Sequence, residues 1–219
     1  MLQIDKTDLT HHHAPHGLSD RFALALVRGL GALARSLFGR RYGNRTIVLE
    51  TIAAVPGMVA ATLLHLKCLR RLQDDRGWVR SLMDEAENQR THLMVFVTLD
   101  RPNGFERILI LLAQGLFYNA HFLICLFSPR TAHRLTGYFA EDAVKGYAEY
   151  LREIDQEQRE NPPAPEVAIA YWNLAPDARL RDAIVAMQAD EAIHRDINHG
   201  FATALANGQD LPDPPSPLL

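Results

Sequence analysis

The sequence predicts an all-α fold with four core helices and two further helices beside them. Long stretches carry apolar side chains at helical spacing, proline and glycine fall mainly between those stretches, and strand-like alternation is scarce. The 219 residues are enough for one compact domain with its own hydrophobic core. These observations together predict a helical bundle.

The expected helices follow one another along the chain. Ser19 and Asp20 are typical of a helix start, and Pro56 lies inside the second helix, which it can kink. The helices are expected at about residues 19–39, 45–72, 75–99, 105–127, 131–160 and 177–206, with a short piece near 167–174.

The two ends differ in composition from the bundle. Residues 1–17 form a polar leader that contains His11, His12 and His13 and lacks the apolar core of a signal peptide, and no function is assigned to it. Residues 207–219 contain four prolines and are expected to be extended. The expected organisation is therefore a leader at 1–17, a bundle at 18–206 and a tail at 207–219.

The charge and the cysteines narrow the functional classes. The formal net charge is −3, so no overall basicity indicates a nucleic-acid partner. Cys68 and Cys125 are the two cysteines, and both lie in apolar, helix-like stretches. Buried free thiols are expected rather than a disulfide, and their spacing predicts no thiolate metal site.

Two of the expected helices raise the question of a membrane. Residues 108–127 are about as long as a bilayer span, roughly 20 residues, but Gln114, Asn119 and His121 interrupt them. In the first helix, arginines border a face of leucine and phenylalanine, which is typical of a helix lying in the plane of a membrane. A core position or a dimer interface remains the alternative for both helices.

Three helices carry acidic and histidine residues that suit a metal site. Glu191 and His194 are three residues apart, so they share a helix face, and this Glu-x-x-His spacing supplies one oxygen and one nitrogen ligand in bundle metalloproteins. His92 is preceded at the same spacing by Gln89, and Glu50 stands in an apolar stretch where a carboxylate needs a partner. A single such motif arises by chance, and Glu50 alone could be a salt-bridge partner, so the prediction rests on the combination.

Several long strings in the chain resemble the alternative oxidases. The similarity is collinear from about residue 18 to residue 201. The strings are LETIAAVPGM from Leu49, EAENQRTHL from Glu85, FYNA from Phe117, YWNL from Tyr171 and ADEAIHRDINH from Ala189.

This resemblance implies a function, a cofactor and a location. It implies a respiratory-chain oxidoreductase that reduces dioxygen to water with electrons from ubiquinol. Iron is the implied cofactor, as two ions held by four glutamates and two histidines in a ferritin-like four-helix bundle. Two additional hydrophobic helices would form the membrane-binding face of a homodimer. The expected location is the inner (cytoplasmic) membrane, as a peripheral, monotopic protein on the inner leaflet of the lipid bilayer.

The family's ligands match this chain only in part. Glu50, His92, Glu191 and His194 stand at four of the six ligand positions. Gln89 and Ala140 stand where the family has glutamates, so two ligands are expected to be missing. The resulting expectation is one metal ion, or a second one that is weakly bound.

Other family positions surround the metals. Tyr147 matches the tyrosine beside them and is expected to take part in catalysis. Arg45, Thr46, Leu49 and Ala143 match the quinol pocket, whereas Asp142 and Gly146 replace a glutamate and a threonine there. Asn88 and Asp190 match positions that orient the histidine ligands.

Three functions follow from this partial match. The first is a membrane-associated quinol:oxygen oxidoreductase of the alternative oxidase type with a modified metal site. The second is a diverged paralogue with a mononuclear metal that oxidises another small substrate. The third is a quinone- or metal-binding protein without oxidase activity. Weak or absent quinol oxidation is expected, because four-electron reduction of dioxygen needs the metal pair.

Overall fold

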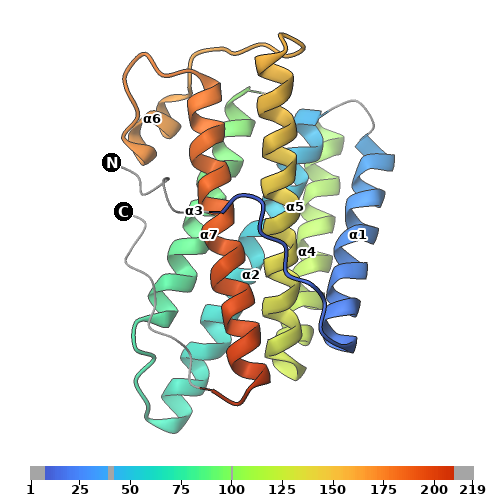
Figure 1. Ribbon diagram of the computed structural model, residues 1–219, viewed down its shortest axis with the longest axis vertical. Coiled ribbons are helices and arrows are strands. Elements are labelled where there is room, and N and C mark those ends of the chain that lie inside the picture. Colours follow the sequence, from blue (N-terminus) through green and yellow to red (C-terminus); the bar gives the residue numbers. More distant parts are fainter. Residues whose placement is uncertain (1–7, 39–41, 100, 210–219) are drawn as a thin grey trace.

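A computed structural model describes residues 8–38, 42–99 and 101–209, and within them it contains seven α-helices and no strand (Figure 1). The predicted all-α class is confirmed. The helices are α1 (Leu18–Phe38), α2 (Tyr42–Arg71), α3 (Trp78–Leu99), α4 (Gly104–Phe127), α5 (Pro129–Asp155), α6 (Glu166–Trp172) and α7 (Leu180–Ala206).

The four helices of the bundle core pack as two pairs. α2 lies closely along α3, and α5 lies closely along α7. α1 packs mainly on α5, whereas α4 packs on α2 and α5, so these two helices stand outside the four-helix core (Figure 1). The short helix α6 contacts α3 and α7 at one end of the bundle. The four core helices and two additional helices expected from the sequence correspond to this arrangement.

Helix ends differ from the expected positions where the backbone turns. α3 begins at Trp78 rather than near 75, because Arg76 and Gly77 have φ angles of 52° and 84°, which no α-helix accommodates. α5 ends at Asp155 rather than near 160, and Glu157 has a φ of 56° just beyond it. α7 begins at Leu180, whose backbone N–H donates to Pro162 O at 2.8 Å.

α2 continues through Pro56, and the glycine that follows sets how closely α2 and α3 pack. A Cβ at Gly57 would lie 2.5 Å from Leu82 O and 3.2 Å from Ala86 N, both on the backbone of α3. Such separations are shorter than van der Waals contact, so only glycine permits this approach of the two helices.

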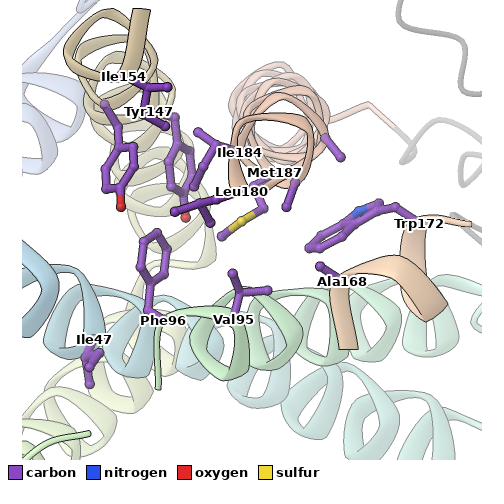
Figure 2. Close-up of a cluster of buried hydrophobic side chains, with 13 residues drawn as sticks. Ile47, Val95, Phe96, Tyr147, Ile154, Ala168, Trp172, Leu180, Ile184 and Met187 are labelled. Carbon is purple, nitrogen blue, oxygen red and sulfur yellow. The ribbon is translucent and has the colours of Figure 1, made fainter. Parts of the chain in front are cut away.

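A hydrophobic core fills one end of the bundle. Val95 and Phe96 of α3 converge there with Leu180 and Met187 of α7 and with Tyr147 of α5 (Figure 2). Trp172 and Ala168 of α6 close the same cluster (Figure 2). These side chains are almost fully removed from water, and the burial of their apolar area stabilises the packing of α6 on the bundle.

The N-terminal segment that precedes α1 crosses the outer side of α5 and α7 (Figure 1). Arg195 of α7 donates to Asp8 O at 2.8 Å, and Tyr138 of α5 donates to His13 O at 3.1 Å. The backbone N–H of His13 donates to Glu141 Oε1 at 2.9 Å. Part of the predicted leader is thus attached to the bundle by hydrogen bonds, whereas residues 1–7 and 210–219 lie outside the described residues.

Two helical segments are long and apolar enough to cross a membrane, by length and composition alone. They are residues 49–71, of which 33% of the tested window is buried, and Gly104–Phe127, of which 17% is buried. α4 therefore presents most of its apolar side chains outwards, unlike a core helix.

Replacing Gly57 by alanine is expected to destabilise the protein by about 1–3 kcal/mol, because the new methyl group would force α2 and α3 apart. The measurement is the free energy of unfolding in denaturant. Gly200→Ala is the matched control, since a Cβ there meets nothing within 4 Å and alanine is the better helix former. Equal stability of the two variants would contradict the close approach of α2 and α3.

Candidate metal centre

Three buried side chains from three helices meet at the centre of the bundle. Glu50 of α2, His92 of α3 and Glu191 of α7 each offer one ligand atom, and these atoms lie within 4.8 Å of one another. His92 Nδ1 is 3.3 Å from Glu191 Oε1 and 3.7 Å from Glu50 Oε2. Such a set of two carboxylates and one imidazole suits Fe(II), Mn(II) or Zn(II).

His92 is oriented by hydrogen-bonding partners on the far side of its ring. Its Nε2 lies 3.4 Å from Asp190 Oδ2. The same oxygen accepts hydrogen bonds from Asn88 Nδ2 at 2.7 Å and from Trp172 Nε1 at 2.8 Å. This network keeps Nε2 on Asp190 and leaves Nδ1 facing Glu50 and Glu191, as in metal sites where a carboxylate fixes the ligating histidine.

Several buried polar atoms at this centre have no hydrogen-bonding partner within the described residues. They are Glu50 Oε2, His92 Nδ1, Gln89 Oε1 and His194 Nε2. An unsatisfied buried polar atom is costly and uncommon in a folded protein. Two of these atoms, Glu50 Oε2 and His92 Nδ1, belong to residues of the three-ligand set, so the residues present fit one metal ion.

The other half of the centre is occupied differently. Gln89 Nε2 donates to Glu191 Oε1 at 2.8 Å and lies 3.1 Å from His194 Nδ1. The amide nitrogen therefore stands between the carboxylate and the imidazole of the Glu-x-x-His pair. An amide supplies no negative charge, so Gln89 fills this position as a neutral group.

Burial and neighbouring charges shift the pKa values at the centre. Burial, together with the charge of Glu191, raises the pKa of Glu50 to about 7, although His92 opposes the shift. Burial would lower the pKa of His92, but the hydrogen bond to Asp190 and the nearby carboxylates of Glu191 and Glu50 outweigh it and raise that pKa to about 10. Burial likewise opposes the ionisation of Glu191, yet His194 and His92 hold its pKa at about 2.

Tyr147 and an apolar cavity adjoin the three ligands. The Tyr147 hydroxyl donates to Glu50 Oε1 at 2.5 Å. Tyr147 also lines a cavity of about 830 Å³, together with Glu50, Gln89, Ala140 and Glu191. Of the expected quinol-pocket residues, the same cavity is lined by Leu49, Asp142, Ala143 and Gly146. Arg45 and Thr46 lie in α2, but their side chains are outside the described part of the chain.

Two residues near the centre were not predicted to have a role there. The indole N–H of Trp172 donates to Asp190, and a buried indole that needs an acceptor was the available signal. Glu85 is buried on α3, and both of its oxygens lie 3.1 Å from Asn198 Nδ2. Burial raises the pKa of Glu85, and the nearby His194 opposes that shift.

Glu141 is next to Ala140 in sequence, but its carboxylate is held by histidines outside the metal-binding cluster. Its Oε1 accepts from His199 Nε2 at 2.9 Å, and its Oε2 pairs with His12. Arg134 Nη1 donates to His199 Nδ1 at 2.9 Å, so the His199 proton lies on Nε2 and points to Glu141. Glu141 is therefore engaged on the outer side of α5, away from the cavity.

Comparison with known proteins finds matches that each cover nearly the whole chain. The family profile described as Alternative oxidase matches residues 2–203. The chain is 48% identical over 211 residues to "Ubiquinol oxidase 2, mitochondrial" of Nicotiana tabacum, covering 96% of this chain and 71% of the relative. It is 47% identical to "Ubiquinol oxidase, mitochondrial" of Mangifera indica and to "Ubiquinol oxidase 1a, mitochondrial" of Arabidopsis thaliana, covering 96% of this chain and 66% and 60% of those relatives.

Metal binding to the three-ligand set is expected to strengthen as the pH rises from 6 to 8. A metal ion competes with protons for these groups, and at pH 6 Glu50, whose pKa is raised to about 7, is largely protonated, as is His92. Calorimetric titration with Mn(II) in buffers of different ionisation enthalpy measures the affinity and the protons released. A pH-independent affinity without proton release would contradict this assignment, and Glu50→Gln should reduce the pH dependence to the part that comes from His92.

Proposed function

Because the chain belongs to the alternative oxidase family, we propose that it is a membrane-associated oxidoreductase that passes electrons from ubiquinol to dioxygen. The observation that carries the proposal is the contact between the buried Glu50–His92–Glu191 cluster and the apolar cavity lined by Tyr147. An apolar reductant can reach a metal-binding cluster there without crossing water. Oxidation of two quinols releases four electrons and four protons, which is what reduction of one dioxygen to two waters consumes.

Different residues of the chain have different roles at this site. Iron, when bound by Glu50, His92 and Glu191, would supply the redox change that links quinol oxidation to dioxygen reduction. Tyr147 lines the cavity and donates to Glu50 Oε1, so a proton leaving a quinol hydroxyl can pass through the tyrosine hydroxyl to this carboxylate. Asp190 and Trp172 keep His92 turned to the cluster.

We also propose that the cluster holds one iron tightly and a second one weakly. Ala140 offers no ligand atom, and Gln89 offers a neutral oxygen in place of a carboxylate. Two hard cations close together need anionic ligands to offset their charges and to bridge them. The proposed consequence is slow quinol oxidation by the chain as it stands.

The membrane surface is proposed to consist of the outward faces of α1 and α4. Leu112 and Leu116 of α4 are 64% and 76% exposed, and Phe127 ends the same helix. On α1, Phe22 and Leu33 are exposed beside the exposed Arg21 and Arg28, which can meet anionic headgroups. The protein would lie on one leaflet without crossing it. The inner (cytoplasmic) membrane and the homodimer stay predictions.

One observation favours a second candidate function. In the structure the Gln89 amide already binds both Glu191 and His194, as a cation would. A centre that holds only one ion at Glu50, His92 and Glu191 would suit a mononuclear oxidation of another small substrate. Metal content and quinol oxidation, measured on the same preparation, distinguish this function from quinol oxidation by a pair of irons.

Restoring both carboxylates in a Gln89→Glu, Ala140→Glu variant is expected to raise iron content towards two ions per chain. Ubiquinol-dependent oxygen consumption should rise by on the order of tenfold or more, since the second iron gains two anionic ligands. Gln89→Glu, Ala140→Gln is the matched control, because it has a similar side-chain volume with one carboxylate fewer. An unchanged rate in the double-glutamate variant would contradict the proposed cause of slow turnover.

Placing two charges on α4, in a Leu112→Glu, Leu116→Glu variant, is expected to weaken binding to lipid vesicles at least tenfold. In the unmodified chain, the exposed apolar area of each leucine would be buried in the bilayer, and this burial favours binding. Flotation with vesicles that contain anionic lipid measures the effect. Leu205→Glu, at the end of α7, is the control and should bind as the unmodified chain does, and equal loss in both variants would contradict the assigned face.

A further inference from the structure

The strap, defined as residues 8–16, crosses the outer side of α5 and α7 before α1 begins (Figure 1). Arg195 Nη2 donates to Asp8 O at 2.8 Å, and the same guanidinium pairs with Asp196. The backbone N–H of His16 donates to Asp20 Oδ2 at 3.0 Å. One end of the strap is therefore bonded to α7 and the other to the start of α1.

The middle of the strap is anchored on the buried Glu141 of α5. Glu141 Oε1 accepts from the backbone N–H of His13 at 2.9 Å and from His199 Nε2 at 2.9 Å, and Oε2 pairs with His12. Lys145 Nζ, one turn along α5, lies 4.0 Å from Oε2. Burial opposes the ionisation of Glu141, but the donors from His199, His13 and His12 hold its pKa at about 2. The anchor therefore stays negatively charged throughout the physiological pH range.

The imidazole of His13 packs against three helices. Its ring stacks on that of His199 of α7, with centroids 4.7 Å apart and an interplanar angle of 22°. The ring of Tyr138 of α5 lies 6.3 Å away, and Asp20 Oδ2 of α1 is 3.7 Å from His13 Nε2. This buried Nε2 has no hydrogen-bonding partner within the described residues. Packing rather than hydrogen bonding holds the ring, and such a site suits the neutral imidazole better than the charged one.

A fixed cation lies beside this ring. Arg134 of α5 donates to His199 Nδ1 at 2.9 Å and to Asp20 Oδ1 at 3.1 Å, so both neighbours of His13 are already bonded to its guanidinium. Arg130 Nη2 is 3.6 Å from the same oxygen of Asp20. A proton on His13 would therefore add a positive charge beside two arginines, and Asp20 is already shared between them.

The pKa of His13 differs between the docked strap and a strap in water. Burial, together with the charge of Arg134, lowers the pKa of His13 to about 4, although Asp20 opposes the shift. A histidine on a released strap titrates near its ordinary value of about 6.5. Docking is therefore fully favoured above about pH 6.5 and is weakened as the pH falls towards 4. From this residue alone, the ratio of docked to released strap should fall about tenfold between pH 7.5 and pH 5.5.

Other titratable groups around the ring act in both directions. Burial lowers the pKa of His199, although Glu141 opposes that shift, so a proton there also disfavours the packing under the strap. The ring of His16 is 5.8 Å from that of His13, and the two would repel each other if both were protonated. A protonated His12 would instead be held more firmly by Glu141 and would oppose release.

We propose that the strap is a pH-sensitive switch, which is docked on α5 and α7 at neutral pH and is released in mild acid when His13 gains a proton. The geometry that carries the proposal is the stack on His199, the unpartnered Nε2 of His13 and the nearby Arg134. Release removes bonds from α5 and α7, the helices that carry Tyr147 and Glu191. The proposal goes beyond quinol oxidation and does not depend on it.

The test uses a nitroxide spin label at Ala14→Cys, an exposed position of the strap, in the full chain with Cys68→Ser and Cys125→Ala. Electron paramagnetic resonance of the protein in maltoside micelles separates immobilised from mobile label between pH 8 and pH 5. We expect an immobilised label at pH 8 and a rise of about tenfold in the mobile-to-immobile ratio between pH 7.5 and pH 5.5. The change should reverse when the pH is raised again, and the circular dichroism of the helices should stay constant.

Three variants provide the controls. His13→Phe keeps a ring that can stack on His199 but cannot take up a proton, so its label should stay immobilised at pH 5.5. Glu141→Gln places an amide against the donors of the strap, so its label should be mobile even at pH 8. His65→Phe, at an exposed position of α2, is the matched histidine control and should respond to pH as the unmodified chain does.

Several results would overturn the proposal. They are a mobile label at pH 8 in the unmodified chain or in His13→Phe, an unchanged line shape down to pH 5, equal release in His13→Phe, and an immobilised label in Glu141→Gln. Release that coincides with loss of the helical signal would also overturn it, because the acid would then unfold the bundle. Failure of quinol oxidation would contradict the proposed function and leave these outcomes unaffected.

Discussion

The burial of Glu50 and Glu191 beside His92 is the constraint on which the rest of the structure depends. Carboxylates removed from water need a proton, a cation or hydrogen bonds, and an apolar bundle supplies few of these by itself. His92 is oriented towards the two carboxylates by Asp190, which in turn accepts from Asn88 and Trp172. The Tyr147 hydroxyl donates to Glu50 Oε1. The close pairs α2–α3 and α5–α7 are the frame that brings these side chains to one point.

Much of this arrangement could be predicted from the sequence. Helical periodicity predicted the helices, and Glu50, His92 and Glu191, which were predicted as ligands, do lie together. His194, which was predicted with them, is not part of this three-ligand set. Helix ends were predicted less well, because the positive φ angles at Arg76 and Glu157 have no strong sequence signal. The bond from Trp172 to Asp190, and the pairing of His12 with Glu141 across 129 residues, depend on packing that a single sequence does not display.

Gln89 and Ala140, which we propose replace two glutamates of the family, affect the centre in two different ways. Gln89 keeps the shape of a glutamate and places its amide between Glu191 and His194, so it fills its position without adding charge. Ala140 keeps neither the shape nor the charge, and the space it leaves joins an apolar cavity. The Glu50–His92–Glu191 cluster and the adjoining cavity are therefore present, whereas Gln89 and Ala140 add no negative charge to the centre.

Iron content after anaerobic reconstitution tests this account most directly. Purified protein is loaded with excess Fe(II), passed through a desalting column and measured for iron per chain by elemental analysis. The account predicts one retained iron, held by Glu50, His92 and Glu191, with the second lost during desalting. Two irons retained per chain would contradict it, because the side chains present would then suffice for the full pair.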